Sequence, residues 1–145
     1  MKILVGIDDS KFSEAALRAV ASQFRPPNVE ICVLHVIQPI TFSVPPQMSA
    51  KYAPELEEQQ KEARALVERA STTLRAAGFK VDTRVETGDV RLKIIDVAAE
   101  WNADLIIVGS HGRGGLPRLL LGSVAEFVAR NAKSSVQIVR LPGGL

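Results

Sequence analysis

A glycine-rich stretch near the carboxyl end of the chain contains the residues best suited to chemistry. The sequence GSHGRGGLPRLLLGS occupies positions 109–123 and holds five of the ten glycines. Glycine costs backbone entropy in a loop, so such a cluster usually means that another group must approach the backbone closely. Bare backbone amides followed by the amino end of a helix form a binding site for anions. The stretch therefore predicts a site for a phosphate or polyphosphate.

The spacing of these glycines produces two clusters of amides. Gly109 and Gly112 form the first cluster, and Gly122 with Ser123 forms the second, after nine intervening residues. Ser123 and Glu126 read as a capping box, with Ser123 as the N-cap of the last helix. Gly122→Val is expected to remove binding and leave the fold intact, because valine would occupy the space of the phosphate oxygens. The pattern is neither a P-loop, since Gly-Lys-Ser/Thr is missing, nor the GxGxxG of dinucleotide-binding domains.

Charged residues elsewhere could complete such a site. Asp8, Asp9 and Ser10 follow the first apolar run. They could be turn residues, with Ser10 capping the first helix, but a carboxylate beside a phosphate is explained by a bridging Mg²⁺. We favour Asp8 over Asp9 as the metal ligand. Arg113 and Arg118 flank the predicted phosphate site, where they could neutralise charge or point to solvent.

The histidines and the cysteine are interpreted as structural residues. His111 lies in the glycine loop without an identified carboxylate partner, which favours packing within the loop over catalysis. His35 and Cys32 lie in the apolar run VEICVLHV, which predicts a half-buried, hydrogen-bonded histidine and a thiol in the core. A lone cysteine cannot form an intrachain disulfide and suits a reducing compartment. We expect no catalytic residue.

The elements that position these residues follow from hydrophobic periodicity. Runs rich in β-branched residues predict five strands, at 2–7, 29–36, 80–86, 103–109 and 135–141. Apolar stripes at three- and four-residue spacing predict four intervening helices, at 12–24, 63–77, 92–101 and 124–132. This alternation predicts one α/β domain over 1–145 with an open, doubly wound parallel sheet. If the strand order is 3-2-1-4-5, Asp8 and the glycine loop face one crevice at the switch point.

Composition and the remaining segments limit the classes of function. The net charge of +2, the lack of adjacent basic residues and the seven aromatic side chains argue against a nucleic-acid surface. No apolar run approaches the ~20 residues that span a bilayer. The chain start, MKILVGIDD, turns acidic after five apolar positions, a run too short for the apolar core of a signal peptide. We therefore expect a soluble, cytoplasmic protein that binds neither nucleic acid nor membrane.

Residues 38–54 hold four of the eight prolines and show neither a helical nor a strand periodicity, which predicts a lid or a disordered flap.

Together these motifs resemble the universal stress protein family over the whole chain. The pattern Gly-x2-Gly-x9-Gly-Ser at 109–123 looks like the family's ATP-binding signature. KILVGIDDSKFSEAAL looks like its first strand, acidic turn and first helix, VLHVI like its second strand, and LLGSVAEFV like its last helix. The resemblance implies a five-stranded α/β domain of the adenine nucleotide alpha hydrolase-like type, a role in stress response, and membership of the ATP-binding branch.

The resemblance also assigns roles to residues. Asp8 corresponds to the acidic residue near the ribose and the metal, and Val36 to the position whose backbone meets the adenine. The positions that line the ribose and phosphates correspond to Gly109, Gly112, Gly122, Ser123 and Val124. The family's third crossover often begins Gly-x-Pro, whereas this chain has Gly88-Asp89-Val90, so we expect a less rigid helix start.

Two functional classes follow from these observations. The first is a regulatory module that binds ATP and Mg²⁺ and thereby signals energy or stress status. The second is an enzyme, either a slow ATPase with autophosphorylation or a nucleotidyl transferase. The region GIDDSKFS lacks the paired histidines typical of adenylyl transfer, and no P-loop lysine is present, which favours the regulatory module. The final run SVQIVRL at 135–141 is expected at the sheet edge with no proline or lysine to block pairing, and predicts a homodimer.

Overall fold

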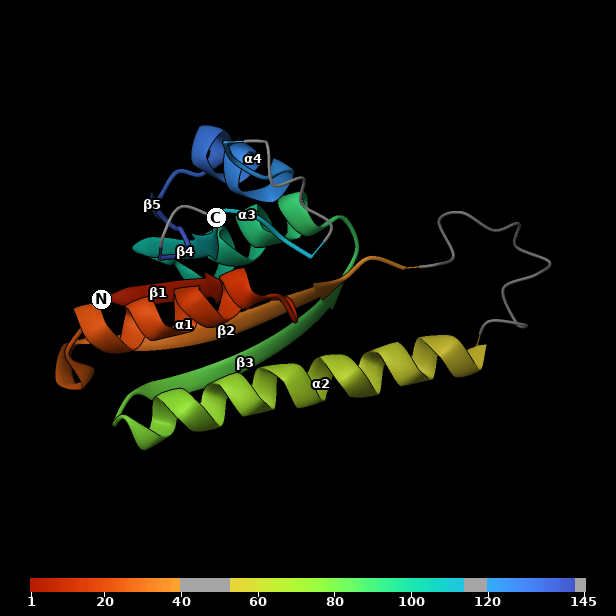
Figure 1. Ribbon diagram of the computed structural model, residues 1–145, viewed down its shortest axis with the longest axis horizontal. Helices are drawn as coiled ribbons and strands as arrows, with labels where there is room; N and C mark the ends of the chain where they lie inside the picture. Colours follow the sequence, from red (N-terminus) through yellow and green to blue (C-terminus); the bar gives the residue numbers. More distant parts are fainter. Residues whose placement is uncertain (40–52, 114–119, 143–145) are drawn as a thin grey trace.

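The chain folds into a five-stranded parallel sheet with helices on both faces (Figure 1). The computed structural model describes residues 1–39, 53–113 and 120–142. Along the chain the elements are β1 (Lys2–Gly6), α1 (Lys11–Gln23), a 3₁₀ turn η1 (Pro26–Asn28), β2 (Glu30–Ile37), α2 (Ala53–Ala76), β3 (Lys80–Thr87), α3 (Val90–Trp101), β4 (Leu105–Gly109), α4 (Ser123–Asn131) and β5 (Ser135–Val139). The predicted α/β class and the alternation of strands and helices are confirmed.

The strand order is β3-β2-β1-β4-β5, as predicted. β1 pairs in parallel with β2 on one side, where Gly6 lies opposite Leu34, and with β4 on the other, where Ile3 lies opposite Leu105. The winding direction reverses between β1 and β4, which opens a crevice at the carboxyl ends of these strands. The acidic turn after β1 and the glycine loop after β4 therefore begin side by side.

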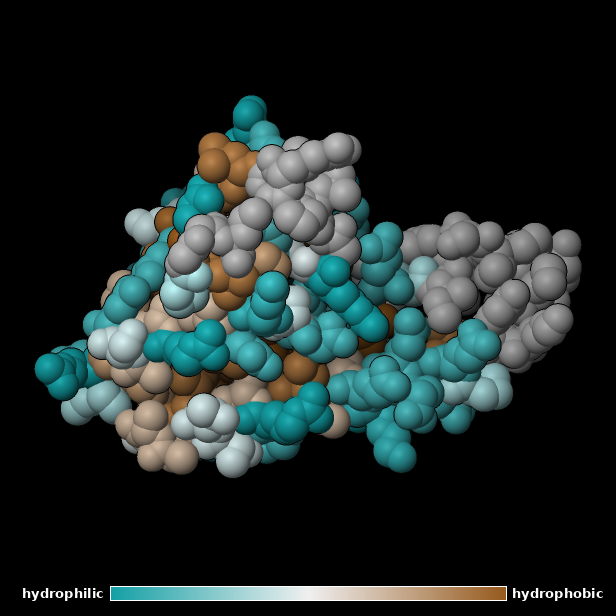
Figure 2. All heavy atoms as spheres, viewed as in Figure 1, coloured by the Kyte–Doolittle hydropathy of each residue, from teal (hydrophilic) through white to brown (hydrophobic). Residues whose placement is uncertain are grey.

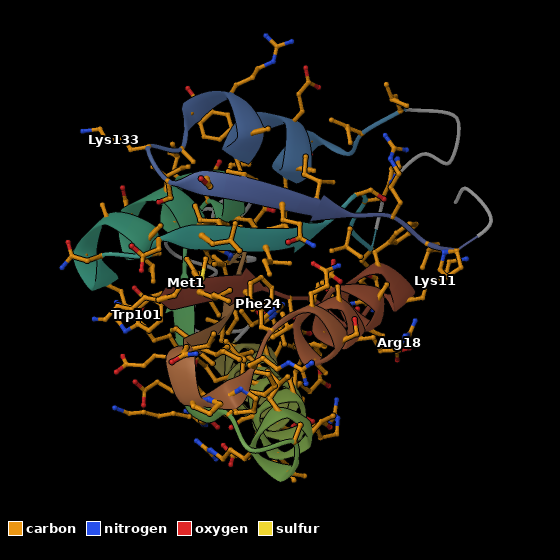
Figure 3. The ribbon with its side chains drawn as sticks, turned by 90° about the vertical axis from the view of Figure 1, so that its left-hand side faces the viewer. Met1, Lys11, Arg18, Phe24, Trp101 and Lys133 are labelled. Carbon is orange, nitrogen blue, oxygen red and sulfur yellow. The ribbon has the colours of Figure 1, made fainter. Side chains whose placement is uncertain are left out.

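Alternate residues of the central strands pack on opposite faces of the sheet. In β1, Ile3 and Val5 pack in the core that contains residues of α1 and α2, whereas Leu4 packs in the core that contains residues of α3 and α4. Figure 3 shows the molecule turned by 90°, with α1 and α3 on opposite sides of the sheet. Strands covered on both faces read as continuous apolar runs, which is why β1, β2 and β4 are so apolar.

The helix ends show which local signals the chain uses. Ser10 caps α1 as predicted, because its Oγ accepts a hydrogen bond of 3.3 Å from the backbone N–H of Ser13. Gly78 follows α2 with φ +97°, the left-handed conformation expected of a glycine C-cap. Asp89 caps α3 by accepting from the N–H groups of Arg91 and Leu92 at 3.0 and 3.2 Å. The side chain of Asp89 thus fixes the start of α3, one residue before Val90, which occupies the position of the proline in Gly-x-Pro.

The outer parts of the molecule agree with their sequence patterns. Hydrophilic side chains cover the visible surface of the first half of α2, at the lower right of Figure 2. Trp101, labelled in Figure 3, packs under Lys2, whose Nζ lies 5.1 Å from the ring centroid.

Within the described ranges, none of the helices has the length and apolar character needed to cross a membrane. Most of the segment 38–54, for which we expect a lid or flap, lies outside the described residues.

Candidate functional site

A cavity of about 340 Å³ opens at the carboxyl end of the sheet, among β1, β2, β4 and the amino ends of α3 and α4. The structure brings every site residue expected from the sequence to its wall: Asp8, Val36, Gly109, Gly112, Arg113, Gly122, Ser123 and Val124. Arg118 belongs to the segment 114–119, which lies outside the described residues. The crevice expected from the strand order is therefore a real cavity.

The apolar part of the wall includes residues that sequence reasoning missed. Leu34 of β2 lies two positions before Val36, and Val108 comes from the end of β4. Val90 and Ile94 of α3 complete this part of the wall. Their spacing could have indicated them, because residues two apart on a strand, such as Leu34 and Val36, and four apart on a helix, such as Val90 and Ile94, share a face. An apolar wall with a few convergent polar groups is typical of a small-molecule site.

Asp8 connects the acidic turn to the glycine loop. Its Oδ1 accepts hydrogen bonds from the backbone N–H of Ser10 and the hydroxyl of Ser13, each at 2.9 Å. Its Oδ2 accepts one from the backbone N–H of Arg113, also at 2.9 Å. A β-carbon on Gly112 would lie only 3.1 Å from that oxygen, so glycine gives the carboxylate room to meet the loop.

The charge of Asp8 is held by this network. Burial acts to raise the pKa of Asp8, but hydrogen bonds from Ser10, Ser13 and the backbone of Arg113 outweigh it, so the pKa is lowered below its usual value. Asp8 is therefore ionised at neutral pH. Within the described chain Asp9 does not line this cavity, and its Oδ1 lies 3.5 Å from Arg113 Nε at the surface. Of the two aspartates, Asp8 is thus the one that lines the cavity.

Two glycines of the loop are required by the packing of the chain itself. A β-carbon on Gly109 would lie 2.7 Å from the β-carbon of Phe12 in α1. A β-carbon on Gly122 would lie 3.1 Å from the Cα of His111 and 3.2 Å from the carbonyl oxygen of Ser110. A valine at position 122 would therefore press on backbone atoms of the loop as well as on any phosphate, so a Gly122→Val variant needs a measurement of folding beside one of binding. Gly122 has φ −71°, a value that any residue can adopt, so its backbone conformation does not require glycine.

The amino end of α4 differs from the sequence prediction. The loop closes on itself where the N–H of Gly122 donates to the carbonyl of Ser110 at 2.7 Å, and Gly122 is then the N-cap. The predicted capping box is wrong, because Ser123 is already helical and Glu126 pairs with Arg130 at 3.1 Å. In the described part of the chain, no side chain caps α4. Its first amides therefore face the cavity without a side-chain acceptor.

Both histidines line the cavity and are held by neighbouring groups. His111 is buried, with its ring centroid 5.2 Å from that of Phe12 and its Nδ1 3.1 Å from the hydroxyl oxygen of Ser110. His35 is half-buried, and its Nδ1 donates to the carbonyl of Ile7 at 2.7 Å, since a carbonyl can only accept. The predicted packing of His111 and the predicted hydrogen bond of His35 are confirmed.

Comparison with known proteins shows the family of the chain. The model of the universal stress protein family matches residues 1–140, and the chain belongs to this family. A universal stress protein of Mycolicibacterium smegmatis is 37% identical over 142 residues, which cover 97% of this chain and 46% of that protein. The chain thus spans less than half the length of that relative.

Solved structures agree with the fold. The structure of MJ0577, a universal stress protein of Methanocaldococcus jannaschii, matches with a TM-score of 0.84 and 30% identity, over 98% of this chain and 96% of that one. A universal stress protein solved in complex with cAMP matches with a TM-score of 0.65 and 26% identity, over 96% of this chain and 95% of that one. A family member of this fold therefore holds an adenine nucleotide.

Proposed function

We propose that this protein is a stress-response regulator that binds ATP, together with Mg²⁺, in the cavity at the carboxyl end of the sheet. One observation carries the proposal: the same cavity is lined by an apolar wall, an ionised carboxylate and the amino end of a helix that has no side-chain cap among the described residues. The related structure in complex with cAMP supports an adenine nucleotide as the class of ligand.

Each part of a nucleotide has a matching part of the cavity. The apolar residues around Val36 suit a flat base, and the backbone at the end of β2 offers hydrogen-bonding groups for its edge. In this proposal Asp8 accepts hydrogen bonds from ribose hydroxyls. The amides of Gly112 and of the first turn of α4, from Ser123 to Val124, bind phosphate oxygens, which the positive end of the helix dipole attracts.

The residues present fit a nucleotide-bound Mg²⁺ better than a metal held by the protein alone. Among the described residues, no group of three or more His, Cys, Asp or Glu side chains could hold a metal ion. Mg²⁺ often binds through a single carboxylate, with phosphate oxygens and waters as its other ligands. Asp8 is that carboxylate in this proposal, and the ion would neutralise phosphate charge beside it.

The chemistry of the wall favours regulation over catalysis. The described residues of the wall include no lysine that could stabilise a transferring phosphoryl group. Asp8 already accepts three hydrogen bonds and has a lowered pKa, which makes it a poor general base. Binding and release of the nucleotide is therefore the proposed activity, with ATP hydrolysis at most a slow side reaction.

We also propose a homodimer that forms through β5, in the segment 135–141. The sheet order places β5 at one edge and β3 at the other. β3 carries charged residues at alternate positions, whereas the strand SVQIV of β5 carries none. Charges on an edge strand oppose pairing with a second copy, so β5 is the edge better suited to it. Antiparallel pairing about a two-fold axis would leave one nucleotide site in each subunit.

Calorimetric titration with ATP, in Mg²⁺ and in EDTA, tests the nucleotide proposal. Asp8→Asn should weaken binding strongly in Mg²⁺ and less in EDTA, because it removes an anionic oxygen ligand of the ion. Asp9→Asn is the matched control and should bind as the wild type does. An equal loss with and without Mg²⁺ would replace the metal role of Asp8 by a direct ribose contact. A folded wild-type protein that binds no adenine nucleotide at millimolar concentration would refute the proposal.

A further inference from the structure

The hydroxyl of Ser13 is buried in the first turn of α1, against Asp8. The side chain is 6% exposed, and it lines the same cavity as Asp8. Ser13 Oγ accepts a hydrogen bond from the backbone N–H of Asp8 at 2.7 Å and donates one to Asp8 Oδ1 at 2.9 Å. The hydroxyl therefore binds both the backbone and the side chain of one residue.

These contacts fix the plane of the Asp8 carboxylate relative to the glycine loop. The carboxylate torsion of an aspartate is broad and roughly two-fold when nothing holds it. Here Oδ1 is engaged by Ser13 and by the N–H of Ser10, which leaves Oδ2 for the N–H of Arg113. Rotation of the carboxylate would break three hydrogen bonds to a charged group, which are about twice as strong as neutral ones.

We propose that Ser13 is a positioning residue of the nucleotide site, whose hydroxyl fixes the plane of the Asp8 carboxylate so that one oxygen meets the backbone of the glycine loop. The consequence for ligand affinity rests on the proposed function, whereas the control of Asp8 by Ser13 does not. Without the hydroxyl, Asp8 would keep its half-buried position but lose one acceptor and one donor.

The loss of this hydroxyl has a defined effect on two backbone amides. The N–H of Asp8 would lose its acceptor, Ser13 Oγ. The N–H of Arg113 keeps its acceptor only while the Asp8 carboxylate keeps its orientation, which the bond from Ser13 Oγ helps to fix. Ser13→Ala should therefore reduce the protection of both amides from hydrogen exchange.

The first measurement follows hydrogen exchange of the backbone amides of Asp8 and Arg113 by NMR, without nucleotide. Ser13→Ala should speed up exchange at both amides, and Ser13→Thr, which keeps the hydroxyl, should restore their protection. Ser22→Ala is the matched control, because this serine is in the same helix and its hydroxyl donates to the carbonyl of Ala19. If Ser13→Ala does not fold, Ser13→Cys preserves the volume with a much weaker donor. Unchanged exchange of the Arg113 amide in the folded variant would overturn the proposal.

The second measurement is a double-mutant cycle with Asp8→Asn, read by ATP affinity. Ser13→Ala should weaken binding about threefold to tenfold when Asp8 is present, the effect of one hydrogen bond of about 0.7–1.4 kcal/mol. It should cost less in the Asp8→Asn background, because Ser13 acts through the charged carboxylate that this variant lacks. An equal loss in both backgrounds would contradict positioning. If the wild type binds no nucleotide, the proposed function fails, and the hydrogen-exchange measurement still decides the role of Ser13.

Discussion

Replacing Ser123 by glutamate separates the stability of α4 from its ability to attract phosphate. Ser123 is exposed and is the first residue of a helix that has Gly122 as its N-cap, with no side-chain cap among the described residues. A carboxylate in the first turn interacts favourably with the helix dipole, by about 0.3–1 kcal/mol. Ser123→Glu is therefore expected to leave the free energy of unfolding unchanged or to raise it slightly.

The same carboxylate should repel the phosphates of a nucleotide. Two like unit charges about 6 Å apart repel by ~0.7 kcal/mol in water and by ~3 kcal/mol at an effective dielectric constant of about 20. Each phosphate charge near the helix end thus reduces affinity between about threefold and about 100-fold. The loss should increase from AMP to ATP, and adenosine should bind nearly as it does to the wild type.

The assay is calorimetric titration of adenosine, AMP and ATP into the wild type, Ser123→Glu and Ser123→Gln, with urea unfolding of each. The glutamine variant matches the size of the glutamate without its charge, so the difference between the two isolates the electrostatic effect. That difference should shrink at high ionic strength, because salt screens exposed charges. If both variants bind ATP equally well, the phosphates do not lie at α4. If Ser123→Glu loses adenosine as well, the effect is not electrostatic.

Three further predictions concern packing, reactivity and assembly. Gly109→Ala should lower the free energy of unfolding by about 1–3 kcal/mol, as overpacking does, because its β-carbon would lie 2.7 Å from that of Phe12; a urea midpoint equal to that of the wild type would show that α1 can move away. Burial raises the pKa of Cys32 to about 11, so iodoacetamide should label the native thiol slowly at neutral pH and the unfolded one quickly; rapid native labelling would contradict this. Ile138→Pro should convert a dimer to monomers in sedimentation, since proline removes a ladder donor; a folded variant that remains dimeric would place the interface elsewhere.

The sequence by itself determined the layered architecture. Apolar runs indicated the strands, three- and four-residue stripes indicated the helices, and their alternation implied a parallel sheet. The order 3-2-1-4-5 then placed Asp8 and the glycine loop at one edge, where the structure has the cavity. Local caps were also readable, because Ser10 and Gly78 act within a few residues of themselves.

The tertiary structure decided how the glycine loop is built. Ser123 has the pattern of an N-cap, but α4 starts one residue earlier, because Gly122 is bound to the carbonyl of Ser110 where the loop closes. Position 109 has no room for a side chain, because Phe12 of α1, which is distant in sequence, packs against it. The sequence predicts that some group approaches these glycines, and the structure shows that protein atoms do.

The same division applies to the acidic residue of the site. The bonds from Ser10 and Ser13 to Asp8 are local and lie within a single turn. The third bond comes from the backbone of Arg113, 105 residues away, and no pattern of residue types encodes a backbone N–H. Periodicity specifies which face of an element is buried, whereas contacts between segments distant in sequence depend on how closely the layers pack.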